Sequence, residues 1–204
     1  MGIYRDRVLP RLIDIALGNK EIEQVRARVA GKLSGEVLEI GFGSGRNVAH
    51  YSPDVTRVHA VEPSPGARRL AQPRIAAGST PVDWVGLDGQ TLTLPDESVD
   101  NVLVTWTLCT IPDVERALAE MHRVLRPEGR LHFVEHGRSG FDDIARRQDR
   151  IDPWWGKVAG GCHVNRPIPD LIRRAGFRIG PLEKYQLEGP SWLSTTFEGT
   201  ASKR

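Results

Sequence analysis

The stretch VLEIGFGSGR, residues 37–46, joins a short apolar run to three glycines at every second position. Each glycine in regular structure costs about 0.5 to 1 kcal/mol relative to alanine, because its backbone loses more freedom on folding. Glycines also permit positive φ and let the backbone approach a ligand with no Cβ in the way. We therefore interpret the stretch as a buried strand followed by a ligand-binding turn built on Gly41, Gly43 and Gly45.

Predicted strands and helices alternate around this turn. Strands are expected over residues 36–40, 57–61, 82–86, 99–109 and 130–136, and helices over 19–30, 64–78 with an interruption at Pro73, and 112–125. Residues 46–51 are expected to begin one more helix. Alternation of this kind implies a parallel sheet with right-handed crossovers. The predicted fold class is α/β, a doubly wound and mostly parallel sheet with helices on both faces.

The last third of the chain is less regular. Residues 140–166 show no clean period, whereas a helix is expected over 169–175 and two further strands after Gly176. These strands complete a predicted seven-stranded sheet. We see no internal repeat and no domain-sized linker, so residues 1–204 are predicted to form one domain, with helices in the N-terminal residues 1–35.

The amino-acid composition limits the classes of molecule that the protein is expected to bind. The 28 basic and 26 acidic residues nearly cancel and the arginines are scattered, so a small organic substrate is expected and nucleic acid is not. Cys109 and Cys162 are the only cysteines, which gives no disulfide framework and no paired-cysteine metal spacing. We predict no metal site, a reducing cytoplasmic location and, without a long apolar run or a signal peptide, no membrane partner.

Two ligand classes use a glycine turn of this kind. Dinucleotide enzymes need the pattern G-x-G-x-x-G, and counting from Gly41 places Arg46 at the final glycine. The spacing G-x-G-x-G is the one used for S-adenosylmethionine. Glu62 ends the second strand, where a carboxylate accepts from both ribose hydroxyls in either class. Asp88, in the loop before the fourth strand, is placed to accept from an adenine amino group.

Four segments carry a family resemblance. VLEIGFGSG, HAVEPSP, LDGQTLTLPDESVDNVLV and RVLRPEGRLHFVEHG resemble, in order and spacing, the motifs of class I S-adenosylmethionine-dependent methyltransferases related to ubiquinone and menaquinone biosynthesis. Farther on, QDRIDPWWGKVAGGCHVNR and FEGTASKR are similar to methyltransferase-like proteins that include alkyl-thiol S-methyltransferases. The N-terminal membrane anchor of that second group has no counterpart in the sequence, which argues against a membrane location and a lipid-like substrate.

The resemblance implies a set of cofactor residues. Gly41, Gly43 and Gly45 would wrap the amino-acid end of S-adenosylmethionine, with Glu39 helping to position its ammonium group. Glu62 would bind the ribose, Asp88 and Gly89 the adenine, and residues 105–107 would lie beside the sulfonium. The full implied set is Glu39, Gly41, Phe42, Gly43, Gly45, Glu62, Pro63, Asp88, Gly89, Thr105, Trp106 and Thr107.

Residues 137–168 are interpreted as an insertion that builds the acceptor site. His136, just past the fifth strand, is the first candidate for a general base, because an imidazole titrates near neutral pH. His163 is a second candidate that would line the acceptor site. Trp154 and Trp155 follow Pro153, and since adjacent side chains diverge, one is expected to line the acceptor pocket and the other to anchor the core.

Direct methyl transfer needs mainly alignment and the exclusion of water, and orientation is worth up to about 7 to 11 kcal/mol. A thiol with a pKa of about 8.5 is already partly ionised at neutral pH and needs little help from a base. The predicted activity is therefore methylation of a small, partly apolar acceptor, with thiol sulfur preferred. Three alternatives remain: C- or O-methylation of a quinol or phenol, non-catalytic binding of S-adenosylmethionine, and a nicotinamide-dependent oxidoreductase.

Overall fold

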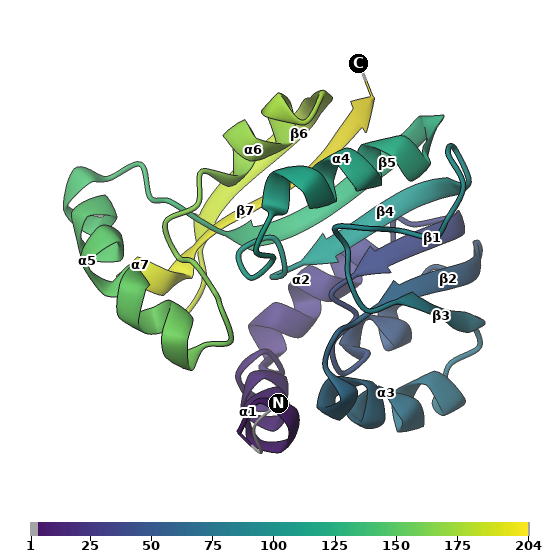
Figure 1. Cartoon of the computed structure of the whole chain (residues 1–204), viewed down its shortest axis with the longest axis horizontal. Helices are drawn as coiled ribbons and strands as arrows, with labels where there is room; N and C mark the ends of the chain where they lie inside the picture. The colour runs from purple at the N-terminus through teal and green to yellow at the C-terminus, as the bar shows by residue number, and fades with distance from the viewer. Residues whose placement is uncertain (1–3, 204) are drawn as a thin grey trace.

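The computed structural model describes residues 4–203, so that residues 1–3 and 204 of the predicted domain lie outside the described part. Its centre is a seven-stranded sheet in the order β3-β2-β1-β4-β5-β7-β6 (Figure 1). The strands are β1 (Gly35–Ile40), β2 (Val55–Val61), β3 (Val82–Gly86), β4 (Val99–Thr105), β5 (Leu125–His136), β6 (Phe177–Gln186) and β7 (Thr195–Lys203). The first five pair in parallel, and β7 pairs antiparallel with both β5 and β6. The predicted doubly wound α/β fold is confirmed.

Helices cover both faces of the sheet (Figure 1). They are η1 (Tyr4–Val8), α1 (Leu9–Ala16), α2 (Lys20–Ala30), η2 (Arg46–His50), α3 (Pro65–Ala77), α4 (Val114–Val124), α5 (Asp142–Val158), α6 (Ile168–Arg174) and α7 (Ser191–Ser194). Side chains of α4 and α6 pack on one face with Val102 and Val104, whereas α2 and α3 pack on the other with Leu103. Burial of β4 on both faces explains the unbroken apolar run at residues 102–104.

Side-chain caps start two of the predicted helices. The Asn19 side chain accepts from the Ile22 N–H at 2.9 Å and starts α2, which ends at Gly31. Asp113 caps α4 through the Arg116 N–H at 3.0 Å. Helix α4 buries an apolar stripe, which comprises Val114, Ala117, Leu118, Met121 and Val124.

The structure differs from the sequence prediction in three elements. Strand β4 ends at Thr105 instead of residue 109, because Trp106 adopts a positive φ of 51°. Helix α3 runs through Pro73 without interruption. The region without a clean period contains the 17-residue helix α5, whose buried positions are Ala145, Gln148 and Asp152. Two of these three positions are polar, so the buried face of α5 lacks the apolar period that predicts a helix.

Strand order fixes where a ligand can bind. The chain passes from β1 outward to β2 and β3, then returns to β4 on the other side of β1. Turns at the carboxyl ends of β1 and β4 therefore diverge and leave a crevice, which is the usual ligand site of such sheets. Among residues 4–203, no helix combines the length and apolar character needed to cross a bilayer.

Candidate functional site

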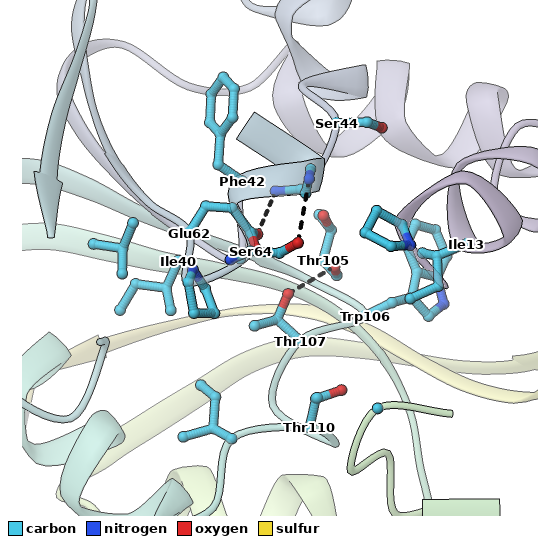
Figure 2. A pocket seen from close by; sticks show the side chains of 18 of the residues that line it. Ile13, Ile40, Phe42, Ser44, Glu62, Ser64, Thr105, Trp106, Thr107 and Thr110 are labelled. Carbon is cyan, nitrogen blue, oxygen red and sulfur yellow. Dashed lines mark hydrogen bonds between the residues drawn. The ribbon is translucent and has the colours of Figure 1, made fainter. Parts of the chain in front are cut away.

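A cavity of about 510 Å³ lies at the carboxyl ends of β1, β2 and β4 (Figure 2). Its walls come from α1, the glycine turn, the ends of β2 and β4, the loop after β3, and the loop after α5. The predicted cofactor residues that line it are Gly41, Phe42, Gly43, Glu62, Pro63, Asp88, Gly89, Thr105, Trp106 and Thr107. Glu39 and Gly45 lie outside the lining.

All three glycines of the turn have positive φ, at 75°, 58° and 76° for Gly41, Gly43 and Gly45. A Cβ on Gly41 would lie 2.0 Å from the Thr107 hydroxyl oxygen, so this glycine lets the ends of β1 and β4 meet. A Cβ on Gly43 would meet no protein atom nearer than 3.8 Å and would occupy the cavity. The turn thus presents bare backbone to the cavity.

Glu62 holds this turn against the end of β2. One carboxylate oxygen accepts from the Gly43 N–H and the other from the Ser64 N–H, both at 2.8 Å (Figure 2). Burial raises the pKa of Glu62, and the two backbone donors partly oppose that shift. Each oxygen keeps a lone pair, so the carboxylate retains two acceptor positions for a ligand.

A carboxylate from β5 binds the backbone that follows the end of β4. Glu135 accepts from the Thr107 N–H at 2.7 Å and from the Leu108 N–H at 3.0 Å. These bonds stabilise the turn that begins with the positive φ of Trp106. Thr105, Trp106 and Thr107 consequently all line the cavity.

A buried polar network lies behind the turn. Asn47 donates to Glu39 at 2.8 Å, and the Tyr51 hydroxyl donates to the other Glu39 oxygen. Arg26 donates to the side-chain oxygens of Asn47 at 2.9 Å and Thr105 at 3.2 Å. Burial raises the pKa of Glu39 to about 7, despite these donors. Glu39 therefore acts on the cavity indirectly, through the residues it positions.

Helix α1 closes one side of the cavity. Asp14 accepts hydrogen bonds from Ser44, from Arg46 at 2.8 Å and from Arg74 at 3.3 Å. Burial alone would raise the pKa of Asp14, but these three donors lower it below its usual value. Arg46, which occupies the last glycine position of a dinucleotide motif, thus fastens α1 to the turn.

On the opposite side the loop after β3 supplies Asp88 and Gly89. Asp88 is exposed and accepts from the backbone and side-chain amides of Gln90, both at 2.8 Å. A Cβ on Gly89 would lie 2.8 Å from an Ile40 methyl, so the loop packs closely on β1. Leu87 and Val61 give this part of the cavity an apolar wall.

The four residues predicted for the acceptor side are absent from the described lining. His136 is buried and its Nε2 lies 3.1 Å from the Cys162 Sγ, so its position does not support a role as general base. Trp155 is directed into a cluster with Cys162 and Trp192, while Trp154 is 73% exposed. His163 lies 2.8 Å from the Asp152 carboxylate. Of residues 137–168, Ala159 and Gly160 line the cavity instead.

Sequence reasoning missed several cavity residues. Arg26 falls on the buried face of α2 with Ile22 and Val29, a helical spacing that marks it as a buried charge in need of partners. Asp14 has no comparable signal, because its partners are distant in the chain. The apolar lining from α1 and the residue after it, which the sequence did not predict, comprises Leu9, Pro10, Ile13 and Leu17.

A family model described as "Methyltransferase domain" matches residues 38–133, which run from β1 into β5. The human protein named thiol S-methyltransferase TMT1A is 33% identical over 168 residues, covering 80% of this chain and 67% of the relative. UbiE of Methylobacterium nodulans, named a ubiquinone/menaquinone biosynthesis C-methyltransferase, is 36% identical over 98 residues, covering 46% of this chain and 39% of the relative.

A solved S-adenosylmethionine-dependent methyltransferase of Leishmania major shares the fold, with a TM-score of 0.72 at 19% identity, covering 98% of this chain and 81% of that one. The cavity fits such a cofactor, because its volume falls in the range of about 300 to 1,000 Å³ usual for small-molecule sites. Gly43 also leaves room that a side chain would fill. Together with the match to the human relative, these findings show that the chain belongs to the S-adenosylmethionine-dependent methyltransferases.

Proposed function

We propose that the protein transfers the methyl group of S-adenosylmethionine to the sulfur of a small, partly apolar thiol. The observation that carries this proposal is the chemistry of the cavity walls. No histidine, lysine, cysteine or tyrosine occurs among the described residues that line the cavity. An acceptor that must lose a proton therefore has no neutral-range base beside it, and a thiol needs such a base least.

The three acidic residues in the lining are already engaged. Asp14 accepts from three side chains, Glu62 accepts from two backbone N–H groups, and Asp88 accepts from Gln90. The donors to Asp14 lower its pKa and make it a poorer base, whereas burial raises the pKa of Glu62 and its two backbone donors oppose that shift. Asp14 adjoins Ile13 on the acceptor side, where its three side-chain donors engage it, whereas Glu62 and Asp88 lie on the proposed cofactor side.

Apolar side chains form the part of the cavity that remains beyond the turn and the β2 end. Leu9, Pro10 and Ile13 from α1 lie on one side, and Ile111 and Pro112 before α4 lie on another. These side chains favour a hydrophobic acceptor and exclude water from it. Alignment without water supplies much of the acceleration that a direct displacement requires.

The proposed cofactor roles follow the turn outward. Gly41 and Gly43 bind the amino-acid end, Glu62 the ribose hydroxyls, and Asp88 with Gly89 the adenine. Residues 105–107 lie at the end of β4, where we place the reacting end. When bound, S-adenosylmethionine supplies an activated methyl group on a cationic sulfur. The protein's own residues then need to orient the acceptor sulfur and keep it dry.

The human relative supports the choice of sulfur, since it is named a thiol S-methyltransferase. This chain spans about two thirds of the length of that relative, so the activity is a proposal for this chain. The UbiE match covers less than half of this chain, so it does not favour carbon over sulfur. A cytoplasmic location and the absence of nucleic-acid partners remain predictions.

A product screen tests the proposal. Purified protein is incubated with isotope-labelled S-adenosylmethionine and matched acceptors that differ only in the nucleophile: benzyl thiol, benzyl alcohol, benzylamine, and a phenol and hydroquinone of similar size. Mass spectrometry should detect the labelled methyl thioether as the main product. Methylation of ring carbon or oxygen instead would assign the protein to the quinol or phenol alternative. Cofactor binding without any product would leave only the binding role.

A further inference from the structure

Three side chains with metal-ligating atoms meet beside the cavity but take no part in the proposed reaction. They are Cys109 in the turn after β4, His136 at the end of β5, and Cys162 in the loop after α5. Their ligand atoms all lie within 4.8 Å of one another, and all three residues are buried. We refer to them as the Cys-His-Cys cluster.

We propose that the Cys-His-Cys cluster binds one Zn²⁺ ion through the two thiolates and the imidazole Nε2. Two sulfurs and one imidazole nitrogen form a ligand set that proteins use for zinc. The cysteine spacing gave no sign of it, because the fold assembles the site from three segments distant in the sequence.

The separation between His136 and Cys162 is close to what the ion requires. Zinc bonds of about 2.3 Å to sulfur and about 2.0 Å to nitrogen, at a tetrahedral angle, place these ligand atoms about 3.5 Å apart. The observed Nε2 to Cys162 Sγ separation is 3.1 Å, so these atoms must part by a few tenths of an ångström. The Thr110 hydroxyl, 3.4 Å from the Cys109 Sγ, is the nearest side-chain oxygen of the described contacts for a fourth ligand position.

A second, independent feature supports thiolate chemistry at the cluster. The Trp155 indole N–H donates to the Cys162 Sγ at 3.3 Å. Such a donor stabilises negative charge on a ligating sulfur and fixes its orientation, as outer-sphere hydrogen bonds do in metal sites. Trp155 is itself held by an edge-on contact with Trp192, with ring centroids 5.0 Å apart. The indole is thus positioned by packing, without help from the ion.

The cluster also joins two walls of the cavity. Cys109 precedes Thr110, which lines the cavity, and Cys162 follows the lining residues Ala159 and Gly160. The His163 N–H donates to the Cys109 carbonyl at 2.9 Å, so a backbone hydrogen bond already joins the two segments. A bound ion would lock the loop after α5 against the turn after β4. We assign it a structural role, because none of its three protein ligands lines the cavity.

Zinc titration of the reduced, chelator-treated protein tests this proposal, with a chromophoric chelator as competitor. We expect one tightly bound equivalent, and an affinity at least about 100-fold lower in the Cys109→Ser/Cys162→Ser double variant. His163→Ala is the matched control, since His163 adjoins Cys162 but pairs with Asp152, and it should retain the full equivalent. Replacement of Zn²⁺ by Co²⁺ should add a thiolate-to-cobalt charge-transfer band.

A further readout needs no variant. The chain has only two cysteines, so alkylation followed by mass spectrometry reports on this cluster alone. One equivalent of Zn²⁺ should slow alkylation of both thiols at least tenfold and raise the melting temperature. Alkylation at the same rate with and without Zn²⁺, or equal zinc uptake by the wild-type protein and the double variant, would overturn the proposal. Neither result bears on S-adenosylmethionine binding or on the acceptor.

Discussion

The backbone N–H of Gly43 donates to the Glu62 carboxylate at 2.8 Å, which ties the turn after β1 to the end of β2. The same carboxylate is one that we propose binds the ribose hydroxyls. One side chain therefore shapes the turn and presents acceptor oxygens to the ligand. In Glu62, the same side chain stabilises the cavity wall and presents hydrogen-bond acceptors to the cavity interior.

Replacing Glu62 by alanine should remove both functions at once. One hydrogen bond to a charged group contributes about 1.5 to 3 kcal/mol, so the loss of even one ribose contact should weaken S-adenosylmethionine binding at least about 10- to 100-fold. Isothermal titration calorimetry measures the change. Glu36→Ala is the control, because Glu36 lies near the start of β1 and contacts His59. Equal affinities in the two variants would contradict the role of Glu62.

Gly43→Ala tests the bare backbone of the turn. A side chain at the φ of 58° is strained by roughly 1 to 2 kcal/mol, and its methyl group would enter the cavity. Cofactor affinity should fall at least tenfold, as measured by calorimetry. Gly189→Ala provides the comparison, since Gly189 also has positive φ, 140°, and open space around it. If Gly43→Ala binds the cofactor as tightly as Gly189→Ala does, the proposed backbone contact is wrong.

Asp14→Ala should loosen α1. Asp14 accepts from Ser44, Arg46 and Arg74, which connect α1 to the glycine turn and to α3. Without this acceptor, amide hydrogen exchange in residues 9–17 should accelerate several-fold, and the KM for an apolar acceptor should rise. Exchange mass spectrometry measures the first effect. Asp54→Ala, in the loop before β2, is the control and should change neither value. Unchanged exchange in Asp14→Ala would show that Asp14 does not hold α1 in place.

Glu39 makes stability depend on pH in a defined direction. Burial raises its folded-state pKa from 4.5 to about 7, so the folded protein binds more protons than the unfolded chain between these values. The free energy of unfolding should therefore fall as pH rises from 4.5 to 7, by about 3 kcal/mol attributable to this group.

Urea denaturation at several pH values measures this contribution as the difference between wild type and Glu39→Gln. The variant cannot titrate at this position, so its stability should fall less between pH 5 and 8. Parallel pH profiles for the two proteins would show that Glu39 ionises normally in the folded state.

Most residues that the sequence predicts for the cofactor line the cavity, because local rules determine where they lie. Gly41 and Gly43 are recognisable from spacing alone, and Glu62 and Asp88 follow from their positions after predicted strands. The strands themselves are identified by short apolar, β-branched runs such as residues 102–104. All of these features depend on neighbours within a few residues.

The acceptor half could not be predicted in the same way. The buried face of α5 contains the polar residues Gln148 and Asp152, so its sequence lacks an apolar period. Their partners lie in other segments, since Gln148 donates to the carbonyls of Gly137 and Val164. His136 ends a strand at the right edge of the sheet, yet it faces Cys162 and not the cavity. The direction of a strand-end side chain depends on tertiary packing, which local sequence does not encode.

The most direct test of the central claim is the pH dependence of kcat/KM for a series of thiols with different pKa values. If the protein supplies no base, the rising limb of each profile should follow the pKa of the thiol used. We therefore expect the inflection to move with the acceptor, from lower pH for aryl thiols to higher pH for alkyl thiols. One inflection at the same pH for every thiol would reveal a protein base and contradict the account.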